Sequence, residues 1–169
     1  MKKIFTTLLS VLAIFTAQAQ INVTFNGQVV NNGDVVEISP TLGTDPFGAT
    51  KLQWPMDPYF TNAGSSATSL SVVVTKDYTE GPELNWCGIT SSCANISGST
   101  ETRSTTLQPG GMAMLHLEPV AEPTESVDCT ATVRVIAGLS NFSFKVHYVY
   151  DNTAGIDGVT AEATGAKAV

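Results

Sequence analysis

Positive charge is scarce in this sequence. It has eight Lys and Arg residues against fifteen Asp and Glu, which gives a formal net charge of −7. Lys2 and Lys3 lie in an N-terminal segment that we expect to be removed, and their loss lowers the charge to −9 (−7 − 2). Binding to nucleic acid or to an anionic membrane surface requires clustered Lys and Arg that displace counterions. The composition therefore argues against both kinds of partner.

Motifs of well-known catalytic sites are also missing. The sequence has no Gly-x-Ser-x-Gly elbow, no His-Glu-x-x-His, no glycine-rich phosphate loop and no aspartate-rich calcium loop. It has two histidines, His116 and His147, and we expect them on separate strands. Two carboxylates for glycoside hydrolysis could be chosen from any of the fifteen acids, so no pair is singled out. We predict a protein that is not an enzyme and that has no catalytic residues, no cofactor and no metal.

The N-terminus has the pattern of a signal peptide, predicted at residues 1–19. Two lysines precede the mostly apolar run 4–15. This run is shorter than the roughly 20 residues needed to span a bilayer. Ala17-Gln18-Ala19 then supplies the small-x-small pattern that a signal peptidase cleaves. We expect an exported chain that begins at Gln20 and has no membrane span; a membrane anchor or a core helix is the alternative interpretation.

Alternation with a period of two is clearest near the C-terminus. In residues 142–150 one face carries Phe142, Phe144, Val146, Tyr148 and Tyr150. Residues 129–138 alternate in the same way, with Cys129 on the apolar side and Gly138 at the end. This periodicity predicts two half-buried strands joined as a hairpin. Weaker strand patterns cover residues 21–25, 34–39, 69–78 and 112–120.

Because strands are many and helix signals rare, the sequence predicts an all-β protein. We expect an antiparallel immunoglobulin-like β-sandwich of about 7–9 strands over residues 20–151. A closed barrel fits the same pattern. Residues 39–66, rich in proline and aromatic side chains, are expected to form a long ordered loop with at most one strand. Residues 152–169, small and polar, are expected to form a flexible tail.

Three interpretations apply to Cys87 and Cys93, which have five residues between them. A thioredoxin-type redox site has two residues between its cysteines and a helix after the first. A zinc site would need ligands from Cys129, His116 and His147, which lack the usual short pairing. A disulfide in an exported chain would close a loop and add about 2 kcal/mol. We favour the disulfide, with Cys129 as a buried free thiol; a bridge from Cys129 to Cys87 stays open.

Aromatic side chains gather in the stretch 47–60, with Phe47, Trp54, Tyr59 and Phe60, and Trp86 lies beside the cysteines. Exposed rings in the loops of a sandwich form platforms for sugar faces. If the protein binds a glycan, we expect Trp54, Tyr59 and Trp86 to form the site. The alternative is that the same rings pack against the core. Either way the expected partner is an unknown protein or glycan at the cell surface.

Several of these features together resemble one family. A tryptophan next to two cysteines, the turn LQPGG and strands that end in FKVHYVYDN are similar to the immunoglobulin-like domain of secreted and surface proteins of Bacteroidota. The resemblance covers roughly Leu70 to Asn152. It implies a sandwich in which the cysteine loop and the LQPGG segment lie between consecutive strands, and a structural or interaction role at the cell surface.

The C-terminal tail resembles another feature of such proteins. The stretch TAGIDGVTAEATGAKAV is similar to the junction that leads into a C-terminal sorting domain of the type IX secretion kind. The resemblance implies that residues 152–169 are a truncated linker to such a domain. We expect extracellular or cell-surface localisation, or residence in the periplasm if the sorting signal is truly absent.

Overall fold

The structure, a computed structural model, describes residues 21–55, 58–138 and 140–153. These residues form thirteen strands and contain no helix, so the predicted all-β fold class is confirmed. No segment within these ranges is therefore a helix that could cross a membrane. The predicted signal peptide and nearly all of the predicted tail lie outside the described residues.

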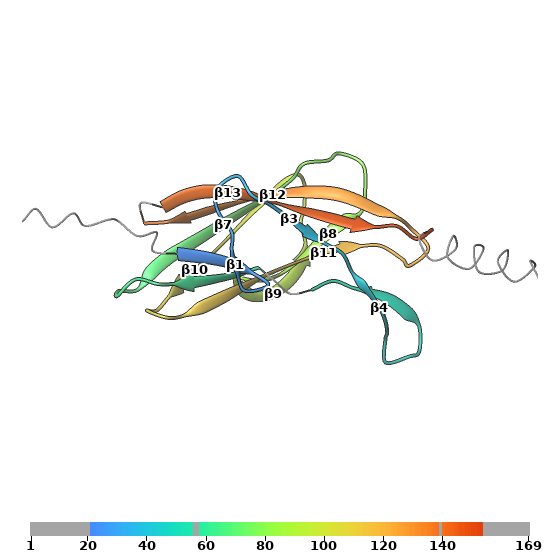
Figure 1. Cartoon of the computed structure of the whole chain (residues 1–169), viewed down its shortest axis with the longest axis horizontal. Coiled ribbons are helices and arrows are strands. Elements are labelled where there is room, and N and C mark those ends of the chain that lie inside the picture. Colours follow the sequence, from blue (N-terminus) through green and yellow to red (C-terminus); the bar gives the residue numbers. More distant parts are fainter. Residues whose placement is uncertain (1–20, 56–57, 139, 154–169) are drawn as a thin grey trace, which may run out of the picture.

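Two sheets make up the body of the protein (Figure 1). One has six strands, in the spatial order β2 (Gln28–Val29), β1 (Ile21–Phe25), β6 (Tyr59–Asn62), β11 (Met112–Val120), β8 (Glu83–Gly88) and β9 (Thr90–Asn95). The other has five, in the order β10 (Thr100–Leu107), β7 (Thr68–Lys76), β12 (Val127–Ala137), β13 (Ser140–Tyr150) and β3 (Val35–Ile38). Neighbouring strands are antiparallel except β3 and β13, which pair in parallel. A separate hairpin consists of β4 (Thr41–Thr44) and β5 (Thr50–Gln53).

The connections match the immunoglobulin pattern. If β1, β6, β7, β8, β11, β12 and β13 are lettered A to G in chain order, one sheet contains A-B-E-D and the other C-F-G. These are the two sheets of a constant-type immunoglobulin domain. The six other strands are insertions, four between A and B and two between D and E. They explain why the structure has more strands than the seven to nine expected.

A single apolar core fills the space between the sheets. In β12 every second residue is buried, from Val127 to Ala137, and its partner β13 buries Phe144, Val146 and Tyr148. Register pairs such as Ala131 with Val146 hold the two strands in the predicted hairpin. Each fully buried Val, Leu, Ile or Phe contributes about 1.5–3 kcal/mol, so the alternation observed in the sequence is the main stabilising feature.

The expectation for residues 39–66 was wrong. Instead of a loop with at most one strand, this segment contains β4, β5 and β6, and β6 is an interior strand of the six-stranded sheet. The prolines misled the prediction because Pro40, Pro46 and Pro58 lie outside the strands, where a missing N–H breaks no ladder. The structure also contains β10, a strand that the sequence patterns did not reveal.

Gly88 ends β8 at an irregularity in its pairing with β9, and its φ of +89° lies in the left-handed region. A Cβ at this position would lie 2.2 Å from the carbonyl oxygen of Met114. Gly98 has a similar φ of +83°, but its Cβ would meet nothing within 4 Å. The two glycines therefore share backbone strain on substitution and differ in steric collision.

We predict that Gly88→Ala lowers the free energy of unfolding by at least about 3 kcal/mol, because it adds a backbone collision to the cost of a positive φ. Gly98→Ala should cost only about 1–2 kcal/mol. Urea unfolding of both variants tests this, and equal losses would contradict the close approach of β8 and β11 at Met114.

Candidate functional site

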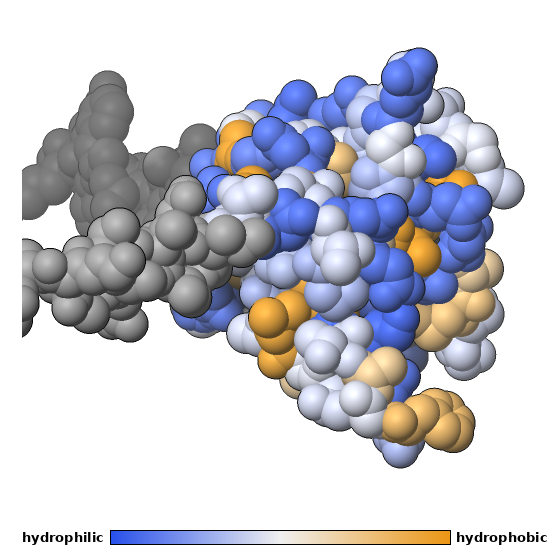
Figure 2. Space-filling view, turned by 90° about the vertical axis from the view of Figure 1, so that its right-hand side faces the viewer, coloured by the Kyte–Doolittle hydropathy of each residue, from blue (hydrophilic) through white to orange (hydrophobic). Residues whose placement is uncertain are grey.

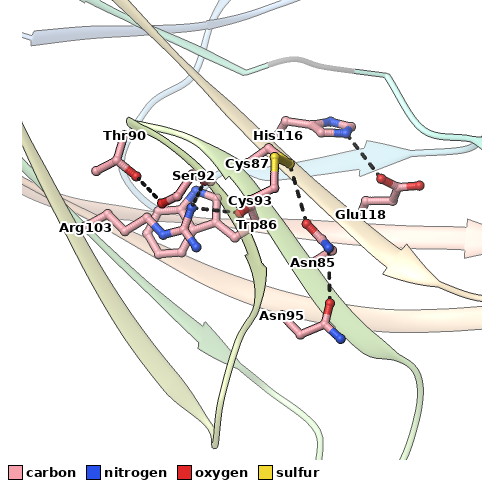
Figure 3. The surroundings of a disulfide bond; sticks show 10 residues. All are labelled: Asn85, Trp86, Cys87, Thr90, Ser92, Cys93, Asn95, Arg103, His116 and Glu118. Atoms are coloured by element: carbon pink, nitrogen blue, oxygen red, sulfur yellow. Dashed lines mark hydrogen bonds and ion pairs between the residues drawn. A yellow bond between two sulfur atoms is a disulfide. The ribbon is translucent and has the colours of Figure 1, made fainter.

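A disulfide joins Cys87 in β8 to Cys93 in β9, with their Cα atoms 4.2 Å apart (Figure 3). Cys87 lies on the outer side of the sheet, because its neighbour Trp86 points inward and is fully buried. The bridge thus fastens an edge strand to its neighbour without entering the core. It also occupies both thiols, so neither is available as a nucleophile or a zinc ligand while the bridge is intact.

The remaining residues considered for zinc lie apart from one another. His116 is in the six-stranded sheet and contacts Glu118 at 3.5 Å. His147 is in the five-stranded sheet, where its Nε2 lies 2.9 Å from Asp128 Oδ1. Within the described residues no three His, Cys, Asp or Glu side chains are grouped to hold a metal ion.

Cys129 is a free cysteine and is 5% exposed. Burial raises the pKa of its thiol to about 11, and the charge of Asp128 acts in the same direction, while a hydrogen bond with Tyr78 partly offsets them. The thiol therefore stays protonated at neutral pH. A protonated, enclosed thiol is a poor nucleophile, which fits a packing role.

An arginine that the sequence patterns did not single out closes one side of the sandwich. Arg103, in β10, is 8% exposed, and its guanidinium carbon lies 4.5 Å from the centroid of the Trp86 ring. Its Nη1 donates to the carbonyl oxygens of Trp86 at 2.7 Å and of Ser92 at 2.8 Å. Its Nε donates to Glu101 at 2.8 Å.

These contacts connect the two edge strands β9 and β10, which belong to different sheets (Figure 3). A guanidinium suits the position because its planar group can stack on a ring while its N–H groups donate at the edges. A charge that points inward also protects an edge strand from pairing with another chain. The sequence signal was the alternation in TETRSTTL, where Arg103 shares the inward face with Leu107.

The aromatic platform expected from Trp54, Tyr59 and Trp86 is not formed. Trp54 is 6% exposed and meets Tyr148 edge to face, with ring centroids 5.4 Å apart. Trp86 is fully buried beneath Arg103, and Tyr59 is half-buried. The structure thus favours the alternative, in which the rings pack, because each buries about 150–250 Å² of largely apolar surface.

The β4–β5 hairpin presents the exposed aromatic ring. It stands out from the sandwich in Figure 1, and Phe47 near its tip is 95% exposed. Asp45 Oδ1 accepts hydrogen bonds from the backbone N–H of Phe47 and of Ala49, both at 2.9 Å. Gly48 supplies the left-handed residue of the turn, with φ +86°. Phe47 is therefore held by an ordered turn.

Two contacts hold the hairpin to the sandwich. Leu52 in β5 is buried with the core, whereas Leu42 opposite it is 61% exposed. Lys51 Nζ lies 2.8 Å from Glu122, in the connection between β11 and β12. This hydrogen bond and the carboxylate charge raise the pKa of Lys51, so the amine is charged at neutral pH. Elsewhere on the face that Figure 2 shows, hydrophobic residues form small separate patches among hydrophilic ones.

Comparisons with known proteins give limited likeness. No family model matches the chain. No curated protein matches it. Among solved structures, it is similar to the N-terminal domain of PorA, with 14% identity, a TM-score of 0.45, and coverage of 79% of this chain and 98% of that one. It is also similar to the CooA pilin subunit from enterotoxigenic Escherichia coli, with 9% identity, a TM-score of 0.30, and coverage of 79% and 99%.

We predict that Arg103→Ala lowers the free energy of unfolding by about 2–4 kcal/mol, because it leaves the Trp86 and Ser92 carbonyls without their donor and uncovers the indole. Arg134→Ala is the matched control, since Arg134 is exposed and bonds only to Asn141 at 2.9 Å among the contacts described. It should cost at most about 0.5 kcal/mol. Equal losses in urea unfolding would show that Arg103 closes nothing.

Proposed function

We propose that this protein is an exported, non-catalytic module that works outside the cytoplasm as a structural or interaction domain. The signal peptide at 1–19 would direct export, and residues 20–151 would form the working domain. The disulfide supports this location, because such bonds persist in oxidising compartments. The Bacteroidota cell surface suggested by the family resemblance is part of the same proposal.

The observation that carries an interaction role is the exposed Phe47. The large rings at 54, 60 and 86 are buried, whereas Phe47 is 95% exposed on a turn fixed by Asp45. Aromatic side chains that enter a partner's pocket dominate the energy of many interfaces. A turn that is already ordered reduces the entropy lost on binding. We therefore propose the β4–β5 hairpin as the contact surface, with Phe47 as its anchor.

The test is binding of the labelled, processed protein to washed cells of the organism that produces it. Phe47→Ala should weaken binding at least about tenfold, since a buried aromatic anchor is worth about 2 kcal/mol or more. It should change the free energy of unfolding by no more than about 0.5 kcal/mol, because the ring touches no core residue. Val120→Ala, at another exposed apolar position (53% exposed), should leave binding unchanged.

Two results would contradict this function. Equal binding of Phe47→Ala and of the unaltered protein would remove the hairpin from the contact surface. Loss of binding on addition of a soluble polysaccharide, with Phe47→Ala unaffected, would replace the proposal with carbohydrate binding elsewhere on the domain.

A further inference from the structure

The end of the sandwich opposite the hairpin carries a pocket of about 300 Å³. It lies where the chain passes from β1 and β2 across to β3, next to the start of β13. Its apolar lining comes from Ile21, Val23, Val29, Val30 and Phe142, and its polar lining from Asn22, Asn31 and Asn32. Val29 is 62% exposed, so apolar surface is open to solvent at the mouth. A cavity of about 150 Å³ already binds benzene, so the ring of a phenylalanine fits here.

Charge distinguishes this pocket from the others on the molecule. The hairpin tip carries the carboxylate of Asp45 beside Phe47. The neighbouring pocket is lined by Asp34 and Glu37, and two further pockets by Glu118 and Glu122 and by Glu125. The pocket at Val29 has no carboxylate in its lining. In a chain with net charge −7, it is the one among these four that accepts an acidic tip without repulsion between like charges.

The amides at the rim can also engage the tip. Asn32 Oδ1 accepts a hydrogen bond from the Ser143 N–H at 2.9 Å, so this side chain is held in one orientation. Its NH₂ group then faces away from Ser143 and can donate to an acceptor. The acidic tip supplies acceptors in the Asp45 carboxylate and the turn carbonyls. Amide donors around an apolar pocket therefore complement acceptors around an aromatic ring.

A molecule cannot fill its own pocket with its own hairpin. Figure 1 shows the start of β1 toward one end of the sandwich and the β4–β5 hairpin at the other. The two complementary features therefore meet only between different molecules.

Resting on the proposed role of the hairpin, we propose that its partner is a second copy of this chain, with Phe47 of one copy seated in the Val29 pocket of the next. Because ring and pocket lie at opposite ends, the contact is heterologous and leaves one of each free in every dimer. Such contacts build open linear assemblies. A buried phenylalanine covers about 150–250 Å², far less than the roughly 1,200 Å² of a stable interface. We therefore expect a dissociation constant on the order of 10⁻⁴ M.

The test is sedimentation equilibrium of the processed chain from about 10 μM to about 1 mM, a range that brackets this constant. The average mass should rise with concentration and pass that of a dimer. Phe47→Ala removes the ring, and Val29→Asp places a carboxylate at the pocket mouth, where it repels Asp45. Each should weaken association at least about tenfold. Val120→Asp, at an exposed valine outside this pocket, should associate like the unaltered chain.

A mixture of the two variants gives the sharpest outcome. Phe47→Ala retains the pocket and Val29→Asp retains the ring, so the mixture should form a one-to-one dimer and nothing larger. Urea unfolding of Val29→Asp checks that it is folded. Monomers throughout the range, association of either variant at the unaltered strength, or a mixture that stays monomeric would each overturn the inference. Monomers whose binding to cells still depends on Phe47 would overturn it while the proposed function stands.

Discussion

The stacking of Arg103 on Trp86 is the contact on which the arrangement of the two sheets depends. The guanidinium lies 4.5 Å from the ring centroid, and Nη1 donates to carbonyl oxygens in both β8 and β9. Since Arg103 belongs to β10, at the edge of the other sheet, one side chain joins the two edges. Burying a charge is costly unless hydrogen bonds compensate it. Here Glu101 and the two carbonyls provide that compensation.

The same contact explains the division of roles among the aromatic residues. Arg103 covers Trp86 on the side where the sandwich would otherwise be open, and the adjacent disulfide keeps β9 in place to accept from it. At the other side, where β2 and β3 are the edge strands, the crossing chain leaves pockets. Large rings are thus consumed by the core, and an exposed ring is available at the hairpin. This asymmetry leads us to place interaction at the hairpin and the pocket.

How far the sequence predicts this structure depends on the kind of signal. Alternation in residues 129–138 and 142–150 predicted the β12–β13 hairpin because each strand has one buried face. The interior strand β6 was missed because Pro58 and the surrounding prolines imitate a loop. Arg103 was missed because a charged residue on a Thr-rich strand is normally solvated, and its burial depends on carbonyls that are distant in sequence. For the tryptophans, sequence gives the ring but not the neighbours that cover it.

The most direct test of this account is the tryptophan fluorescence of the processed protein, measured with acrylamide quenching before and after addition of a panel of polysaccharides. Because Trp54 and Trp86 are 6% and 0% exposed, the account predicts blue-shifted emission, weak quenching and no response to any polysaccharide. Red-shifted emission that acrylamide quenches and a particular glycan protects would contradict it. Such a result would mean that the rings form a binding surface and that Arg103 does not hold Trp86 in the core.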